Sequence, residues 1–139
     1  MATNIRPEIS SKNKYWIDKH RFYELKHFCL QYPTWKKTYE ALDELGMNVS
    51  MFDRQPTGNG IGDLTAKYAI RKAYYSDKIE MIQKAAMEAD EELYIYILKA
   101  VTEGLSYAYL ATRMDLPCSR DTYYDRYRRF FWILSEVRD

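Results

Sequence analysis

The residues best suited to chemistry in this chain are arginines set among tyrosines close to its end. They are Arg120, Arg126, Arg128 and Arg129. A guanidinium group donates paired hydrogen bonds to guanine or to phosphate oxygens. A short helical segment over residues 107–114 and a turn containing Pro117 come directly before this stretch. A short helix, a turn and a longer basic helix are typical of a helix-turn-helix DNA reader.

The last helix is predicted to follow the N-cap Ser119 and to have one apolar and one polar face. Its apolar residues recur at four-three-four-three spacing and are Tyr123, Tyr127, Phe130, Leu134 and Val137. The first two turns of a docked recognition helix reach base edges. The residues expected there are Arg120, Asp121, Thr122, Tyr124 and Asp125. Arg128 and Arg129 lie further along the helix, where phosphate contacts are expected.

A solvated terminal helix is the alternative interpretation of the same residues. Asp121 and Arg128 are one heptad apart, and Asp125 and Arg129 have the i, i+4 spacing of a local ion pair. The two aspartates would also repel phosphate. A continuous positive strip on the exposed side of the helix would favour DNA, whereas acidic breaks would favour a protein partner.

Charge is unevenly distributed along a chain whose formal net charge is only +1. Residues 12–38 are basic, and we expect Lys14, Lys19 and Arg21 to anchor phosphates. Residues 88–103 are acidic. RNA polymerase and a second copy of the chain are the candidate partners of this acidic stretch. Solvated helix faces are the alternative for both stretches.

The fold is predicted to be an all-α helical bundle, because no stretch alternates strictly between polar and apolar residues. Residues 1–11 are expected to form a flexible tail, and residues 12–46 a helical hairpin. Residues 47–62 hold three of the five glycines and predict a connector loop. Residues 63–139 are expected to form a long helix and the helix-turn-helix, packed with the hairpin as one domain.

Local signals set the expected helix boundaries. The first helix, over 14–31, should end before Pro33. The second helix, over 35–45, should lie between the N-cap Thr34 and Gly46. The caps expected further along are Asp63 before a long helix reaching residue 88, Gly104 after the fourth helix, and Ser106 before the short helix. The apolar stripe of the long helix suits either packing within the bundle or a short coiled-coil dimer seam.

Several function classes are excluded by the residues present. His20 and His27 are seven apart, which is not the spacing of metal ligands on a helix. No catalytic motif occurs, and the adjacent Glu91 and Glu92 would point apart on a helix, so we expect neither an enzyme nor a cofactor. The two cysteines are expected to be free thiols in a reducing compartment. Without a signal peptide or a long apolar run, the protein is expected in the cytoplasm, away from membranes.

Three motifs occur in a characteristic order along residues 20–137. Tyr32-Pro33 precedes a lysine-bearing helix, and Asp63-Leu64-Thr65-Ala66 follows the glycine-containing loop. Gly104-Leu105-Ser106-Tyr107 then precedes Ser119-Arg120-Asp121-Thr122-Tyr123-Tyr124. In this order the chain resembles the RinA/ArpU-type phage transcriptional regulators, which have a sigma-factor-region-4-like helix-turn-helix.

The resemblance implies a regulator of double-stranded phage DNA in a bacterial host cell, and specifically an activator of late genes. The family's recognition-helix role falls on Arg120, Thr122, Tyr123, Tyr124, Arg126, Arg128 and Arg129. The turn between Ala111 and Ser119 is about two residues longer than in a typical helix-turn-helix. The alternative function is a helical protein-interaction module, either an inhibitor of a host or defence protein or a DNA-packaging accessory, that does not read DNA.

Overall fold

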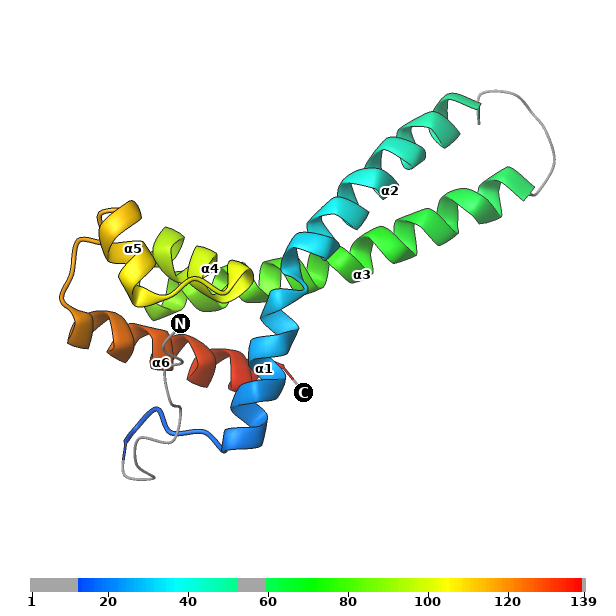
Figure 1. Cartoon of the computed structure of the whole chain (residues 1–139). Coiled ribbons are helices and arrows are strands. Elements are labelled where there is room, and N and C mark those ends of the chain that lie inside the picture. Colours follow the sequence, from blue (N-terminus) through cyan, green and yellow to red (C-terminus); the bar gives the residue numbers. More distant parts are fainter. Residues whose placement is uncertain (1–12, 53–59, 139) are drawn as a thin grey trace. The chain divides into compact units, whose positions relative to one another are not determined.

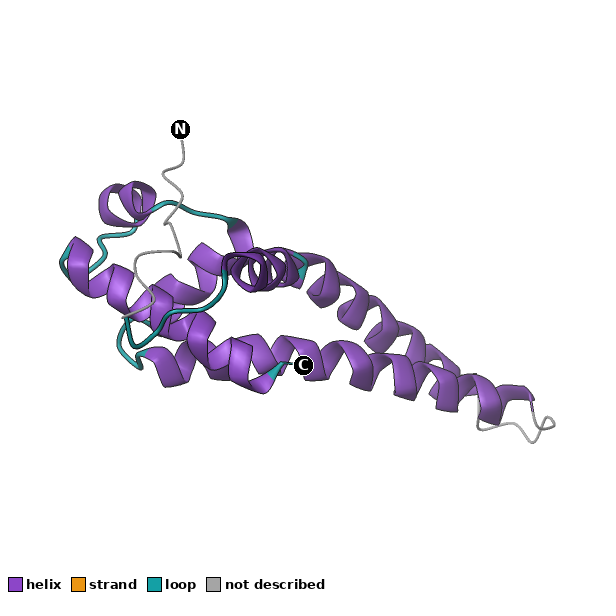
Figure 2. Cartoon of the chain, turned by 90° about the horizontal axis from the view of Figure 1, so that it is seen from below, coloured by secondary structure: helices purple, strands orange, loops and turns teal. Residues whose placement is uncertain are grey.

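The computed structural model describes residues 13–52 and 60–138, and all regular structure in them is helical (Figures 1 and 2). The helices are α1 (Lys19–Leu30), α2 (Tyr32–Phe52), α3 (Gly60–Ala89), α4 (Tyr94–Glu103), α5 (Tyr107–Arg113) and α6 (Arg120–Val137). The predicted all-α class is therefore confirmed. The expected tail, residues 1–11, lies outside the described residues.

The chain divides into two compact units. The first unit contains α1, α3 from Met81 onward, α4, α5 and α6. The second unit is Tyr32–Glu80, which comprises α2 and most of α3. The boundary falls at Gln31, inside the hairpin predicted for residues 12–46, so α1 and α2 belong to different units. The physical reason is that α1 buries its apolar residues against α4 and α6.

The first helix begins five residues later than predicted, because residues 13–18 form a capped turn. The backbone N–H of Tyr15 donates to Asn13 Oδ1 at 2.8 Å, and that of Trp16 donates to Asn13 O at 3.0 Å. Asp18 then caps α1, its carboxylate accepting from the backbone N–H of His20 at 3.0 Å. Lys14 therefore lies in the turn and not on the helix.

The second helix is longer than predicted at both ends. Pro33 lies in the first turn of α2, where its missing N–H is not needed. Thr34 is inside the helix rather than its N-cap, and its carbonyl accepts from Thr38 Oγ1 at 2.9 Å. Gly46 does not end the helix, which continues to Phe52. An interior glycine costs only about 1 kcal/mol relative to alanine, so it is a weak stop signal.

The loop predicted over residues 47–62 is helical at both of its ends. Helix α2 includes residues 47–52, and α3 already begins at Gly60. Residues 53–59 lie outside the described residues. Asp63 is in the first turn of α3 rather than before it, a position where a carboxylate still interacts favourably with the helix dipole.

Two lysines of α3 connect it to α2 within the second unit. Lys72 forms an ion pair with Asp43, which raises the pKa of the lysine, and lies 5.3 Å from the centre of the Tyr39 ring. Lys78 Nζ lies 5.2 Å from the centre of the Trp35 ring. Trp35 itself is buried. Aromatic rings and amphipathic lysines thus contribute to the contacts between the two helices.

The apolar stripe predicted on α3 is buried only in part. Ile79, Ile82 and Ala86 are buried, whereas Leu64 near the start of the helix is 42% exposed. The later part of the stripe therefore packs within the chain. The first turns leave apolar surface uncovered, so a dimer seam remains a prediction for that part alone.

The core of the first unit lies where α1, α4 and α6 meet. The Phe22 and Phe131 rings are in edge contact at 4.9 Å, and Leu25 and Ile97 are fully buried. The predicted apolar face of α6 is confirmed by the burial of Tyr123, Tyr127, Phe130 and Leu134. Val137 was predicted there too, but it is 54% exposed. Val137 follows Leu134, which is the last buried residue of α6. The next residue, Arg138, packs on α1, with its guanidinium carbon 4.2 Å from the centre of the Phe28 ring.

Arg21 holds the end of α6 against α1. Its Nε donates to Ser135 Oγ at 3.1 Å, and another guanidinium nitrogen donates to the carbonyl oxygens of Ser135, at 3.0 Å, and Arg138. It also pairs with Glu24 at 2.5 Å, and Arg138 reaches the same carboxylate at 3.2 Å. The predicted phosphate anchor Arg21 is therefore engaged within the chain.

Acid is expected to remove the contribution that Glu24 makes to stability. The hydrogen bond from Arg21, and then the charge of Arg138, hold the pKa of Glu24 below its usual value of 4.5. Because this pKa is lower in the folded than in the unfolded chain, the contribution is present above pH 4.5 and is lost as the pH falls through the folded pKa.

Thermal unfolding checks this prediction. The melting temperature should be higher for the wild type than for Glu24→Gln at pH 7, and the difference should shrink below pH 4. Glu136→Gln removes an exposed carboxylate of α6 and is the matched control. The prediction would be contradicted if the melting temperatures of the wild type and Glu24→Gln differed by the same amount at pH 7 and below pH 4.

Candidate nucleic-acid interface

The entry into α5 is built from a glycine cap and a serine cap. Gly104 has the left-handed φ of 70°, and the N–H groups of Gly104 and Leu105 both donate to Ala100 O, at 2.9 and 3.1 Å. Ser106 then caps α5, its Oγ accepting from the N–H of Tyr109 at 3.1 Å. Both predicted caps are confirmed. They fix where α4 ends and α5 begins.

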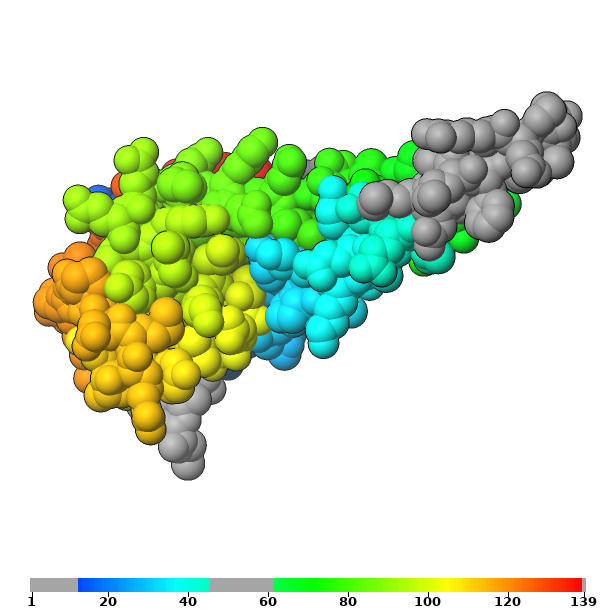
Figure 3. All heavy atoms as spheres, turned by 90° about the horizontal axis from the view of Figure 1, so that it is seen from above, coloured from blue at the N-terminus to red at the C-terminus, as the bar shows by residue number. Residues whose placement is uncertain are grey.

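The turn between α5 and α6 has a left-handed residue that sequence reasoning missed. Asp115 has φ 51°, a conformation that aspartate tolerates better than most residues. The N–H groups of Met114 and Leu116 both donate to Leu110 O, at 3.1 and 3.2 Å. Ser119 then caps α6, as predicted, accepting from the N–H of Thr122 at 3.2 Å. The turn lies on the surface of the first unit (gold and orange in Figure 3).

Tyrosines pack the start of α5 against the start of α6. The Tyr107 ring lies 5.7 Å from that of Tyr123 and 5.8 Å from that of Tyr124. Tyr123 is fully buried, and burial raises the pKa of its hydroxyl. It therefore belongs to the core and does not lie at the surface where DNA contact was predicted. Its hydroxyl has no hydrogen-bond partner among the described residues.

Arg120 is held on these tyrosines while remaining exposed. Its guanidinium carbon lies 5.3 Å from the centre of the Tyr124 ring and 6.0 Å from that of Tyr107. Cation–π contacts of this kind limit the positions that a long side chain samples. Asp121 and Thr122 follow it and are exposed as well. The predicted base-reading residues of the first turn thus lie together at the surface.

Arg126, in contrast, is engaged in the chain's own ion pairs. Its Nε lies 3.0 Å from Asp90 Oδ2, and its second contact is to Asp125 at 3.0 Å. Asp90 also accepts from the N–H groups of Glu92 and Leu93 in the turn before α4. Arg126 therefore links α6 to this turn. The sequence could not show this, because Asp90 is 36 residues away.

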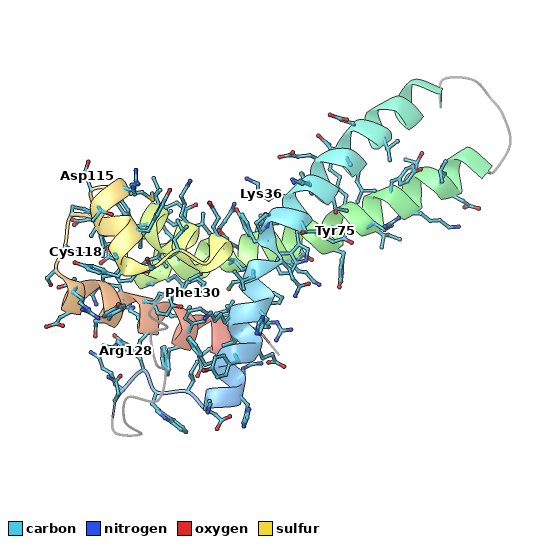
Figure 4. All side chains as sticks on the ribbon, in the orientation of Figure 1. Lys36, Tyr75, Asp115, Cys118, Arg128 and Phe130 are labelled. Atoms are coloured by element: carbon cyan, nitrogen blue, oxygen red, sulfur yellow. The ribbon has the colours of Figure 1, made fainter. Side chains whose placement is uncertain are left out.

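The remaining arginines of α6, Arg128 and Arg129, are both partly exposed. Figure 4 shows Arg128 and Phe130 on opposite sides of the helix. Asp125 pairs with Arg126 rather than with Arg129, and the alternative pair of Asp121 with Arg128 does not form. Among the described residues, neither Arg128 nor Arg129 has a carboxylate within ion-pair distance. The exposed part of α6 carries both signs of charge, because Asp121 is exposed and Asp125, Arg128 and Arg129 are partly exposed.

The two predicted lysine anchors remain at the surface. Lys14 Nζ lies 5.0 Å from the centre of the Tyr15 ring, and that ring lies 5.9 Å from the ring of Trp132 on α6. Lys14 is thereby placed beside α6. Lys19 is exposed at the first position of α1. The structure brings Lys14 and α6 together, although they are more than a hundred residues apart in the sequence.

Other chemistry is limited in the part of the chain that the structure describes. No three histidine, cysteine or carboxylate side chains lie together there as metal ligands would. Cys29 is buried, and burial raises the pKa of its thiol and also the pKa of the Cys118 thiol. None of the described helices has both the length and the apolar character needed to span a membrane.

Comparisons with protein-family models, curated proteins and solved structures give no match.

Proposed function

We propose that the protein is a DNA-binding transcriptional regulator that inserts the first turns of α6 into the major groove. The observation that supports this best is the position of Arg120. It is exposed at the first residue of a capped helix and rests on two tyrosine rings. A guanidinium held in this way loses little conformational freedom when it forms a bidentate contact with guanine.

The proposed contacts divide by their position along the helix. Arg120 would read guanine, Asp121 would accept from a cytosine amino group, and Thr122 and Tyr124 would contribute further contacts in the groove. Arg128 and Arg129 would bind phosphates, with Lys14 and Lys19 as additional anchors. Arg126 and Arg21 would instead support the interface, since their donors bind other parts of the chain.

The biological setting rests on the resemblance to the RinA/ArpU-type regulators. It supports a phage protein that activates late genes in the bacterial cytoplasm. An activator needs a contact with the transcription machinery, and the exposed Glu91 and Glu92 beside α4 are the proposed surface for host RNA polymerase. A homodimer would place two recognition helices on neighbouring half-sites.

Replacing Arg120 tests the proposal. The protein would first select duplexes from a random-sequence library, and binding would then be measured by fluorescence anisotropy at low and rising salt. We expect Arg120→Ala to weaken binding to the selected duplex by about 1–3 kcal/mol and to relax the preference for one base pair. Lys84→Ala removes an exposed positive charge from α3 and serves as the control. Selection that recovers no preferred sequence, or an unchanged Arg120→Ala affinity, would refute the proposal.

A helical protein-interaction module remains the second candidate, favoured by the charge on the exposed side of α6. Asp121 and Asp125 interrupt the positive charge of Arg120, Arg128 and Arg129. Such breaks are typical of a surface that meets a protein with charges of both signs. Co-purification from infected cells tests this candidate. A protein that is retained after nuclease treatment, and is lost with Asp121→Arg, would support it over DNA.

A further inference from the structure

Two tryptophans of the first unit lie at the surface. Trp16 is 42% exposed and Trp132 is 37% exposed, whereas Trp35 in the second unit is only 4% exposed. Tryptophan has the largest apolar surface of any side chain and is highly buried on average. The two exposed indoles are therefore candidates for contacts with a ligand.

The aromatic residues around Trp132 are held by the chain itself. The Tyr15 and Trp132 rings meet at 5.9 Å with an interplanar angle of 58°. Asn13 fixes the turn that carries Tyr15 and Trp16 through hydrogen bonds to both backbone N–H groups. The rings are thus brought together from two distant parts of the sequence and positioned before any ligand arrives.

Positive charge surrounds these rings. Lys14 Nζ lies 5.0 Å from the centre of the Tyr15 ring. Arg128 and Arg129 precede Trp132 by one helical turn, so their side chains neighbour it on the helix surface. Arg128 Nε is shielded from solvent and has no hydrogen-bond partner among the described residues. Figure 4 shows Arg128 on the side of α6 away from the core residue Phe130.

The carboxylates near these rings are few. Asp18 caps α1 through the N–H of His20, and Asp125 is paired with Arg126. Glu136 lies one turn after Trp132 and is exposed. Glu136 is thus the one of these three carboxylates without a hydrogen-bond or ion-pair partner among the described residues, against the three cations Lys14, Arg128 and Arg129.

We propose that Tyr15, Trp16 and Trp132, with Lys14, Arg128 and Arg129, form a binding site for single-stranded DNA. Unpaired bases would stack on the exposed rings, while the cations bind the phosphates between them. A duplex fits this surface poorly because its base faces are already covered by neighbouring base pairs. The site goes beyond the proposed reading of a duplex, since it adds the rings of Tyr15, Trp16 and Trp132 and recognises base faces rather than base edges. It shares only the phosphate-binding cations Lys14, Arg128 and Arg129 with the duplex proposal.

Binding of the full chain to an oligothymidine of about 15 nucleotides tests the site. Fluorescence anisotropy gives the affinity, and quenching of tryptophan emission reports stacking. Trp132→Ala is expected to weaken binding about 10- to 100-fold, and Trp132→Phe much less, because phenylalanine retains an aromatic face. Tyr109→Ala removes a 46% exposed ring from α5 and is the matched control. Circular dichroism confirms that each variant is folded.

An abasic strand of the same length separates stacking from charge. It keeps the phosphates but lacks bases, so binding should be at least 10-fold weaker than to oligothymidine. Equal binding to both strands, or unchanged binding by Trp132→Ala, would overturn the proposal. The proposal would also be overturned if the surface around Trp132 retained a protein partner instead of DNA.

The result of the oligothymidine experiment can be distinguished from that of the duplex experiment. Arg120→Ala should leave oligothymidine binding unchanged, because Arg120 lies three turns before Trp132. A wild-type chain that selects no preferred duplex sequence but still binds oligothymidine would refute the proposed regulator and leave the single-strand site intact. Duplex binding without oligothymidine binding would refute only the single-strand site.

Discussion

Replacing Phe130 by alanine is expected to lower the free energy of unfolding of the first unit by about 3–5 kcal/mol. Phe130 is fully buried, and its ring packs at 4.9 Å against that of Phe131, which in turn contacts Phe22 of α1 at the same distance. Truncation removes apolar contacts and leaves a cavity in the core of the first unit. A typical domain is stable by only about 5–15 kcal/mol, so this one substitution removes a large part of the free energy of unfolding.

Urea denaturation followed by circular dichroism measures the effect of Phe130→Ala. Val137→Ala on the same helix is the control, because Val137 is 54% exposed and its truncation should change stability by less than about 0.5 kcal/mol. Similar unfolding midpoints for the two variants would show that the core of the first unit does not depend on the Phe130 ring.

Replacing Leu110 by alanine is expected to cost about 2–5 kcal/mol and to detach α5. Leu110 is the one buried residue of this seven-residue helix, and it is fully buried. A helix this short has little stability of its own and depends on tertiary packing. The carbonyl of Leu110 also accepts the two hydrogen bonds that close the turn before α6.

Hydrogen exchange distinguishes detachment of α5 from global unfolding. In Leu110→Ala, amides of α5 and of the turn through Asp115 should exchange faster, while those of α1 should be affected least. Tyr109→Ala changes the neighbouring residue, which is 46% exposed, and should leave α5 protected. Uniformly faster exchange throughout the first unit would contradict a local role for Leu110.

The same variant also bears on the two proposed DNA sites. Arg120 rests partly on Tyr107, which α5 carries, so detachment of α5 should weaken duplex reading. Trp132 is supported by Tyr15 and not by α5. Oligothymidine binding should therefore survive in Leu110→Ala at temperatures where the first unit remains folded.

The local signals in the sequence determined the caps around α5 and α6. Gly104, Ser106 and Ser119 act through atoms within a few residues of themselves, so their residue types suffice to predict them. The buried face of α6 followed from spacing for the same reason, since a 3.6-residue period fixes which side chains share a side. Proline and glycine were less reliable: Pro33 is tolerated in the first turn of α2, and Gly46 in its interior.

Only the tertiary structure decided which cations are available for binding. Arg21 and Arg120 have the same side chain, yet the donors of Arg21 are taken by the end of α6 while Arg120 remains exposed. Arg126 is likewise engaged by Asp90, and Lys14 is brought to α6 by the contact between Tyr15 and Trp132. These partners are 36 to 117 residues apart, a separation that no local pattern records. Residue type determined what each side chain can bind, and packing between distant helices determined what it does bind.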